Sequence, residues 1–339
     1  MKKELQLHSS QWGKSITSIY FGGGTPSVLS PKEFTELYEE INQNYDLKMI
    51  DEVTLECNPE DLIEEKLEAW IKQGVNRLSI GNQSFQDPIL KTINRQHNAK
   101  MAIDGIMKAR EYGFNAISVD VIMGLPGLTM DLLEEDLRTL MDLDPEHISA
   151  YQLSVEEKTK LAYQLKKGEI KISSDEEINQ QFLMMDTFLN ANGYSHYEVS
   201  NYAKMGFEAK HNSSYWSGVS YLGIGPGAHS FKDNIRRWNV SNNNLYAKEL
   251  TKNGKWFEEE VLDEKDRFNE RIMISLRIKK GLDLGMLQKD FPLFYTNEID
   301  KNILSWINND WAVLERGSVQ LTLKGWLISD KLASDIFVI

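Results

Sequence analysis

Segments typical of β-strands and of α-helices alternate regularly through the first half of this 339-residue chain. Runs rich in β-branched and aromatic residues predict strands at Ser15–Phe21, Glu52–Cys57, Arg77–Ile80, Ala116–Ile122 and His147–Leu153. Helical patterns lie between them, at Pro31–Tyr45, Asp61–Gln73, Ala99–Tyr112 and Thr129–Leu143. Alternation at this spacing predicts an α/β fold with a parallel sheet, either a barrel or an open doubly wound sheet.

Polar and glycine-rich residues gather directly after successive predicted strands. They are Gly22–Thr25, Glu56 with Asn58, Asn82–Gln83, Asp120 with Gly124, and Gln152 with Ser154. A β/α barrel places all the loops that follow its strands around one mouth, so such residues meet at one ligand. A doubly wound sheet would concentrate them at its switch point instead. We therefore expect a β/α barrel.

The predicted barrel is incomplete. Met1–Gln11 is predicted to be a helix that leads directly into the first strand, so the pattern lacks a strand and a loop before it. We therefore expect a partial, N-terminally truncated barrel with an open sheet edge. The chain also lacks the GxGxxG fingerprint and the GxxxxGK[ST] loop, which argues against nicotinamide and nucleoside triphosphate sites.

The alternation fades from about Glu156, and this change predicts three regions. We assign residues 1–160 to the partial barrel, 161–260 to an extension rich in histidine and aromatic residues, and 261–339 to a C-terminal module. The last region combines helical patterns with the short alternating run Val319–Leu323. Helices followed by a small hairpin predict a mostly helical, winged-helix-like module.

Charge and cysteine content narrow the functional classes. The net charge of 38 − 51 = −13 opposes binding to nucleic acid and to anionic membranes. No stretch is long and apolar enough to span a bilayer, and no signal-like segment begins the chain, so we expect a cytoplasmic protein. The single cysteine, Cys57, excludes an internal disulfide and a cluster held by several thiolates of this chain. We expect Cys57 to be a small buried hydrophobic residue.

Several motifs, in order along the chain, together resemble one protein family. The segments Tyr20–Ser27, Leu55–Glu60, Arg77–Phe85 and Asp120–Gly127 resemble the radical S-adenosylmethionine proteins related to oxygen-independent coproporphyrinogen oxidase. Two later segments, His211–Trp216 and Tyr221–Ser230, resemble the heme chaperones within that group.

The resemblance implies a binding site for S-adenosylmethionine at the strand ends. In it, Gly23 approaches the methionine moiety with Gly24 and Thr25 beside it, because bare backbone leaves room for a bulky sulfonium. Glu56 would accept hydrogen bonds from the ribose hydroxyl groups. The polar positions that line the rest of the pocket match Gln83, Arg95 and Asp120. The simpler alternative is that these carboxylates cap helices or pair with cations.

The resemblance also implies a heme site at His211. Neutral imidazole is a common ligand of heme iron, and Tyr215 and Trp216 would supply flat apolar surface for a porphyrin. The alternative is a histidine bonded within a loop that packs against the barrel. His196 and His229 are minor candidates for the same role.

The sequence departs from the family at one point. Family members carry CxxxCxxC upstream of the triple glycine; these three thiolates hold a [4Fe-4S] cluster, whose fourth iron binds S-adenosylmethionine. This chain has no such cysteines, so we expect neither that cluster nor reductive cleavage on its residues. Either the segment is missing from this sequence or the protein is a cluster-free relative, and the absent strand favours the first explanation.

Three functional interpretations stay open. The first is a heme-binding chaperone that hands heme to acceptor proteins. The second is an oxygen-independent coproporphyrinogen III oxidase, a dehydrogenase of porphyrin biosynthesis that would require the cluster. The third is an inactive truncated relative. The resemblance also leaves room for peripheral association with a membrane and for a homodimer.

Overall fold

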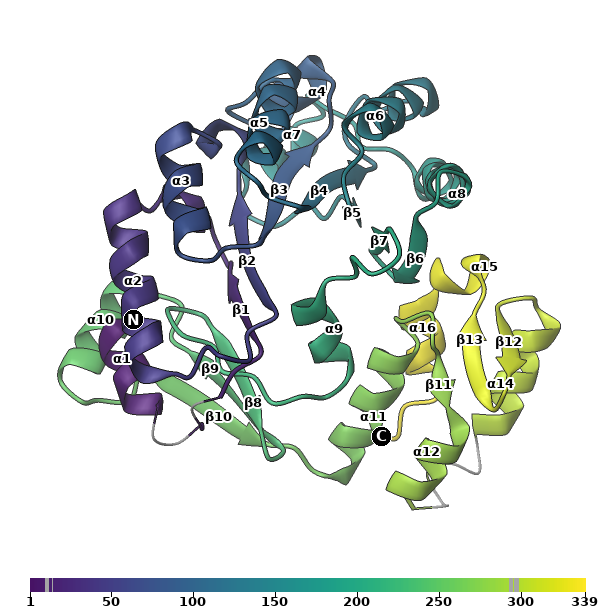
Figure 1. The fold of residues 1–339 in the computed structure, drawn as a ribbon. Helices are drawn as coiled ribbons and strands as arrows, with labels where there is room; N and C mark the ends of the chain where they lie inside the picture. Colours follow the sequence, from purple (N-terminus) through teal and green to yellow (C-terminus); the bar gives the residue numbers. More distant parts are fainter. Residues whose placement is uncertain (10–11, 14, 293–294, 296–298) are drawn as a thin grey trace.

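The computed structural model describes residues 1–9, 12–13, 15–292, 295 and 299–339. The first half of the chain forms one curled sheet with the order β1-β2-β3-β4-β5-β7-β6 (Figure 1). The first five strands are parallel, and the last two join in antiparallel pairs. The strands are β1 Ser18–Phe21, β2 Glu52–Cys57, β3 Arg77–Gln83, β4 Ala116–Met123, β5 His147–Gln152, β6 Ser195–Glu198 and β7 Asn201–Ala203.

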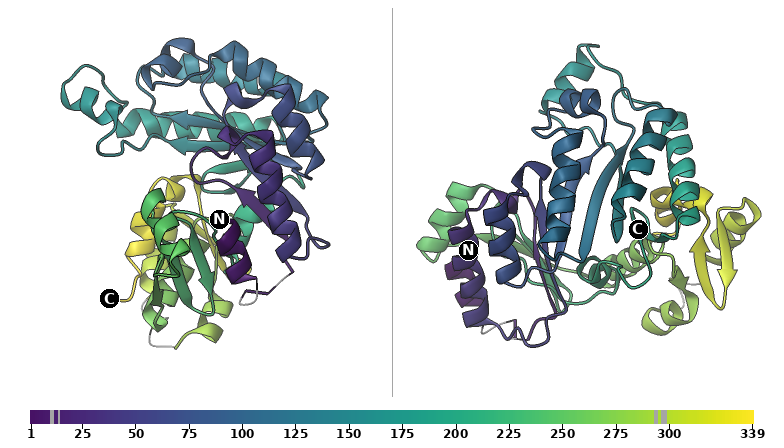
Figure 2. Two further views of the ribbon diagram at one scale, coloured as in Figure 1. Left: turned by 90° about the vertical axis from the view of Figure 1, so that its left-hand side faces the viewer. Right: turned by 45° about the horizontal axis from the view of Figure 1, so that its top comes forward.

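Helices cover the convex outer face of this sheet, and the sheet does not close (Figures 1 and 2). The helices of this region are α2 Pro31–Asn44, α3 Glu64–Lys72, α4 Asp87–Thr92, α5 Ala99–Glu111, α6 Met130–Leu143 and α8 Asp175–Ala191. The prediction of a partial β/α barrel is thereby confirmed. The predicted first helix is α1 Lys2–His8, and the predicted residues 10–11 lie outside the described part of the chain.

Local signals in the sequence account for where these helices begin and end. Ser30 and Ser174 each accept a hydrogen bond from the backbone three residues on, and the glutamate there bonds back, which completes a capping box. Thr129 caps α6 in the same way without the glutamate. Gly74 and Gly113 follow helices with φ of 91° and 95°, the left-handed backbone that favours glycine.

The two faces of the sheet differ in chemistry. On β2, the fully or almost fully buried Val53 and Leu55 face outward and pack in the core beneath the helices. Their neighbours Glu52, Thr54 and Glu56 face the concave side, because successive strand residues point to opposite faces. The same alternation on the other strands gives the concave side a polar lining.

A second sheet and α9 lie on the open side of the curl, whereas α10 lies beside α1 (Figure 1). The sheet has the order β10-β9-β8 and is antiparallel. These elements are α9 Lys210–Trp216, β8 His229–Lys232, β9 Ile235–Asn239, α10 Asn243–Thr251 and β10 Phe257–Val261.

The carboxylate of Glu4, which is fully buried, fastens α1 to this second sheet. It accepts hydrogen bonds from the Gly225 backbone N–H (2.9 Å), Asn239 Nδ2 (2.6 Å) and the Tyr246 hydroxyl. Trp256 Nε1 contributes a longer bond of 3.4 Å. One carboxylate therefore collects donors from three segments more than 200 residues away in the sequence.

The C-terminal part consists of helices around a small antiparallel sheet of order β11-β13-β12, as predicted for a winged-helix-like module. Its elements are α11 Glu264–Ser275, β11 Leu282–Asp283, α12 Leu284–Asp290, α14 Ile299–Asn308, β12 Ala312–Glu315, β13 Ser318–Leu321, α15 Leu323–Trp326 and α16 Ser329–Ser334. Residues 277–279 bond to the edge of β6, through Val199 N to Arg277 O (2.8 Å) and Lys279 N to Tyr197 O (3.0 Å). This contact joins the C-terminal part to one edge of the large sheet.

One further helix, α7 Lys160–Lys166, buries none of its residues and lies on a segment that projects from the body of the molecule (Figure 2). Among the described residues, no helix combines the length and the hydropathy needed to cross a bilayer.

We expect Glu4→Gln to lower the free energy of unfolding by about 2–4 kcal/mol, because an amide cannot accept from all of the surrounding donors. Urea denaturation of the purified protein measures the change. Glu39→Gln, at an exposed position of α2, is the matched control and should change stability by about 0.5 kcal/mol or less. Equal stability of the two variants would contradict the anchoring role of Glu4.

Candidate functional site

Glu56 lies on the concave face near the end of β2, as the prediction requires. Its carboxylate accepts a hydrogen bond from the Tyr20 hydroxyl (2.6 Å) and a longer one from the Gly23 backbone N–H (3.2 Å). A Cβ on Gly22 would lie 2.4 Å from the Tyr20 ring and 2.7 Å from Glu56 Oε1. Gly22 is therefore the residue of the triple glycine whose missing side chain permits this close contact.

Gly23 and Gly24 contribute differently. Their φ angles of 79° and 149° belong to backbone that favours glycine, and a Cβ on either residue would meet no atom within 4 Å. The loop thus presents bare backbone to open space, as a ligand-binding loop would. Thr25 follows and caps no backbone group of the short 3-10 helix Pro26–Val28.

Gln83 and Arg95 meet at the end of β3. A Cβ on Gly81 would lie 3.1 Å from Gln83 Nε2, 3.3 Å from Arg95 Nη2 and 3.4 Å from Asn58 Oδ1, so these three polar side chains converge over one glycine. Arg95 donates to Asn58 Oδ1 (2.7 Å) and to the Gly81 carbonyl (2.6 Å). Gln83 itself has a left-handed backbone, φ 76°, at an irregularity in the pairing of β3 with β4. Strained backbone of this kind is common at binding sites.

Asp120 lies on β4 and completes this group. Ser79 Oγ on the neighbouring strand lies 3.5 Å from its carboxylate. Burial raises the pKa of Asp120 to about 7, and the charge of Glu56 acts in the same direction, whereas hydrogen bonds from Ser149 and Ser79 and the charge of Arg95 oppose the rise. Glu56 and Arg95 therefore both act electrostatically on Asp120, and a carboxyl group with such a shifted pKa is typical of functional sites.

His211 lies on α9, against the same concave face. Its ring stacks on Tyr20 with a centroid distance of 4.9 Å and an interplanar angle of 21°. Nδ1 bonds to Ser18 Oγ (2.9 Å) and Nε2 to the Tyr215 hydroxyl (3.0 Å). Burial lowers the pKa of His211, although the Glu52 carboxylate opposes this, so the ring is neutral at pH 7 and can act as a metal ligand.

The two aromatic residues of the predicted heme site lie on the same helix. Tyr215 is 38% exposed and packs edge-on against His211 and against Tyr221. Trp216 is half-buried, and its enclosed Nε1 has no hydrogen-bond partner among the residues that the structure describes. The motif therefore combines a neutral imidazole with adjacent aromatic rings.

The two minor candidates lie in different surroundings. His196 is buried between Tyr202 and Trp326, with ring centroids 4.0 Å away in each case. Its nitrogens bond to Asp186 and to the Val199 carbonyl. His229 is exposed at the start of β8. Neither shares the environment of His211.

The residues present fit S-adenosylmethionine better than they fit an iron–sulfur cluster. Bare glycine backbone, the carboxylates of Glu56 and Asp120, and the Arg95 guanidinium supply partners for a sulfonium, a diol, an amine and a carboxylate. Cys57, the one cysteine, is 4% exposed on the outer face of β2, and burial raises the pKa of its thiol well above the ordinary value. The residues of this chain therefore supply no set of three thiolates that could hold an iron–sulfur cluster.

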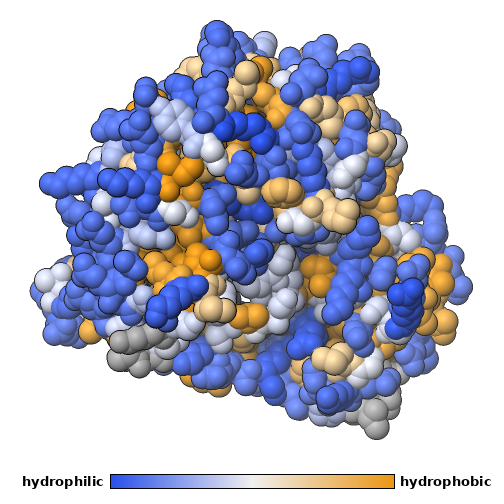
Figure 3. Space-filling view, viewed as in Figure 1, coloured by the Kyte–Doolittle hydropathy of each residue, from blue (hydrophilic) through white to orange (hydrophobic). Residues whose placement is uncertain are grey.

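Four residues of the concave face were missing from the sequence-based prediction: Ser18, Tyr20, Glu52 and Arg77. They lie within strands, whereas the prediction considered mainly residues that follow strands. The available signal was polar spacing at every second position, as in Ser18 with Tyr20. Figure 3 shows hydrophilic residues in the middle of this open side.

A separate surface hollow of about 410 Å³ lies at the opposite, amino-terminal ends of the strands. Its lining includes Asn76, Arg77, Asn115, Phe207 and Lys210. In β/α folds small molecules bind at the carboxyl ends of the strands, so the hollow does not mark the predicted cofactor site.

Comparison with known proteins gives matches over most of the chain. The Radical SAM superfamily model matches residues 3–140, and the HemN C-terminal domain model matches residues 262–328. The heme chaperone HemW of Lactococcus lactis is 32% identical over 94% of this chain and 84% of its own length. That of Bacillus subtilis is 36% identical over 84% of this chain and 75% of its own length.

One solved structure shares the fold. Coproporphyrinogen III oxidase (HemN) of Escherichia coli, a radical SAM enzyme, superposes with a TM-score of 0.84 over 99% of this chain and 81% of that chain. At 21% identity this similarity concerns the fold alone.

We expect Asp120→Asn to stabilise the protein, and more so at pH 8 than at pH 5. The folded-state pKa of about 7 lies above the ordinary 3.8, so wild-type stability falls as the pH rises between these values. The gain should differ by on the order of 2 kcal/mol between the two conditions. Urea denaturation measures it, with Asp142→Asn at an exposed position of α6 as control. A gain independent of pH would show that Asp120 titrates normally.

Proposed function

We propose, because the chain belongs to the HemW/HemN-like family of radical SAM proteins, that it is a heme-binding chaperone that delivers heme to acceptor proteins. Relatives that match over most of this chain are named heme chaperones. Heme is then the cargo, and the acceptor proteins are the partners.

The observation that carries this proposal is the setting of His211. Its neutral ring lies at the open side of the curl, and Nε2 points to the half-exposed Tyr215 while Nδ1 points to the sheet. An imidazole nitrogen on the outward side, beside aromatic rings, is what a heme iron and its porphyrin require. Binding there requires the Tyr215 hydroxyl to leave Nε2, and its exposure permits that movement.

S-adenosylmethionine is the second ligand that we propose, at Gly23, Gly24, Thr25, Glu56, Gln83, Arg95 and Asp120. The family supports this ligand, and the convergence of Glu56, Arg95 and Asp120 supports these residues. Glu56 would orient the ribose, and Arg95 and Asp120 would pair with the carboxylate and the amine. Reductive cleavage also needs a cluster, which the residues of this chain do not fit, so we assign no cleavage to it.

The alternative, an oxygen-independent coproporphyrinogen III oxidase, rests on the fold that the chain shares with HemN. That activity would need the iron–sulfur cluster. The relatives from Lactococcus lactis and Bacillus subtilis are named heme chaperones, which favours the chaperone function for this chain. Four further interpretations stay predictions: peripheral association with a membrane, a homodimer, a cytoplasmic location, and an inactive truncated form of the protein.

We expect His211→Ala to weaken heme binding at least about tenfold, because the variant lacks the imidazole ligand. Titration of hemin followed at the Soret band measures the affinity. His229→Ala, at an exposed histidine, is the matched control and should bind as the wild type does. Unchanged affinity in His211→Ala would remove His211 as the ligand, and a melting curve of each variant checks that it is folded.

We expect Glu56→Gln to weaken binding of S-adenosylmethionine about tenfold in isothermal calorimetry, since a charged acceptor for two hydroxyl groups is replaced by an amide. Tyr20→Phe is the informative control. It removes the hydroxyl that now occupies Glu56 and leaves the carboxylate in place, so its affinity should equal or exceed that of the wild type. Equal binding by Glu56→Gln and the wild type would exclude the ribose role of Glu56.

A further inference from the structure

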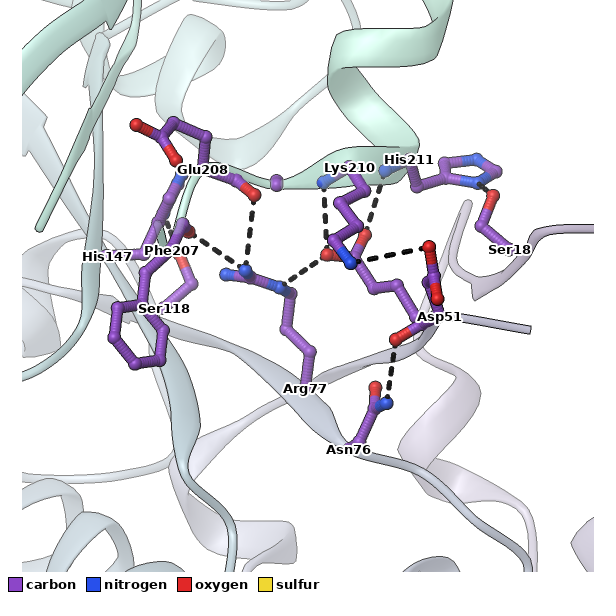
Figure 4. A network of polar contacts seen from close by, with 12 residues as sticks. Ser18, Asp51, Asn76, Arg77, Ser118, His147, Phe207, Glu208, Lys210 and His211 are labelled. Atoms are coloured by element: carbon purple, nitrogen blue, oxygen red, sulfur yellow. Dashed lines mark hydrogen bonds and ion pairs between the residues drawn. The ribbon is translucent and has the colours of Figure 1, made fainter. Parts of the chain in front are cut away.

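Two neighbouring positions of the sheet bind the same histidine. Ser18 on β1 and Glu52 on β2 are partners in the strand pairing, and both form hydrogen bonds with His211. Figure 4 shows Ser18 beside the ring of His211. We infer that Glu52 fixes the backbone of His211 and that Ser18 Oγ accepts a hydrogen bond from its Nδ1–H, so that Nε2 presents its lone pair to iron. This inference rests on the proposed function, and it makes both residues positioning residues for the heme ligand.

Glu52 holds the start of α9. Its carboxylate accepts hydrogen bonds from the backbone N–H groups of Lys210 (3.0 Å) and His211 (2.8 Å). The first N–H groups of a helix have no partner within the helix, and no side chain caps α9 locally. A strand residue 159 positions away in the sequence supplies the missing acceptor. The position of His211 is thus set by the sheet rather than by its own loop.

Arg77 holds Glu52 and the segment before α9 together. Its Nε donates to Glu52 (2.9 Å), and its Nη2 donates to the Phe207 carbonyl (2.8 Å). The side chains of Arg77 and Glu52 are 6% and 5% exposed, so little water competes for these bonds. Figure 4 shows Arg77 between the strands and the segment from Phe207 to Lys210. The ion pair therefore restrains the chain from Phe207 up to His211, at the start of α9.

Ser18 governs the ring. The Nδ1 bond to Ser18 is partly buried against the sheet, whereas the Nε2 bond to Tyr215 is exposed. Only Nε2 therefore faces a side from which a porphyrin can approach. A histidine that binds a metal through one nitrogen usually donates the other N–H to a fixed acceptor, which sets the tautomer and raises the basicity of the ligand. Ser18 occupies that position.

A purely structural role would make a different prediction. If Ser18 and Glu52 only attached α9 to the sheet, their loss would lower stability without changing the tautomer of His211 or the strength of an iron–imidazole bond. The test therefore needs readouts that report the ring itself.

The first readout uses the heme-free protein. Nitrogen-15 NMR of the imidazole groups, of which the chain has six, reports which nitrogen of His211 carries the proton, and His211→Ala identifies its signals. We expect the Nδ1–H form to predominate in the wild type. Ser18→Ala should lose this preference, and Ser18→Thr, which keeps a hydroxyl, should retain it.

The second readout uses the ferrous heme complex. Resonance Raman spectroscopy should show a lower iron–histidine stretching frequency in Ser18→Ala than in the wild type, with the frequency restored in Ser18→Thr. Glu52→Gln should instead weaken heme binding about tenfold at an unchanged frequency, because the ring bond to Ser18 persists. Circular dichroism confirms that each variant is folded. Should Ser18→Ala not fold, Ser18→Thr is compared with the wild type instead, and the inference requires it to keep the wild-type tautomer and stretching frequency.

The outcomes separate two failures. A wild-type tautomer and a wild-type stretching frequency in Ser18→Ala would overturn the role of Ser18, and wild-type affinity in Glu52→Gln would overturn that of Glu52. In both cases the proposed function stands if His211→Ala still loses heme. Heme binding that is indifferent to His211→Ala would instead remove His211 as the ligand, and a wild-type protein that binds no heme would overturn the proposed function.

Discussion

Alternation of side chains along the parallel strands gives the large sheet one apolar and one polar face. The outward residues, such as Leu55 and Ile80, are fully buried beneath the helices and supply the core. In most parallel sheets helices cover both faces, and the strands are apolar throughout. Here the curl leaves the concave side open, so it can carry Glu56 and Asp120. Stability and ligand chemistry are thereby divided between the two faces.

Polar groups on the concave face need partners, and many of them pair with one another. The buried ion pair of Glu52 and Arg77 shows what this achieves. Removing both charges from water is costly, so such a pair adds little net stability. The pair does, however, make directional bonds: it joins β2 and β3 to the backbone of Phe207, before α9, and to that of His211 within it. Its role is therefore to position α9. Burial helps in this, because a buried ion pair can form in only a few arrangements of the two side chains.

The sequence predicted whatever depends on local pattern. The bounds of β2, Glu52–Cys57, coincide with the prediction, and α2 begins at Pro31 as predicted. Some of the polar residues after the strands meet: Gly23 bonds to Glu56, and Arg95 bonds to Asn58 beside Gln83. What escaped prediction depends on tertiary contact. Ser18 and His211 are 193 residues apart, and no local signal shows that a seven-residue helix will lie against the first strand.

Tyr20 makes the two halves of the site one unit. Its hydroxyl bonds to Glu56, the residue we assign to the nucleoside, while its ring stacks on His211, the residue we assign to iron. A ligand that takes both carboxylate oxygens of Glu56 competes with this hydroxyl, and any resulting shift of the ring moves the surface on which the imidazole rests. The two halves of the site thus share one side chain, which contacts a residue of each.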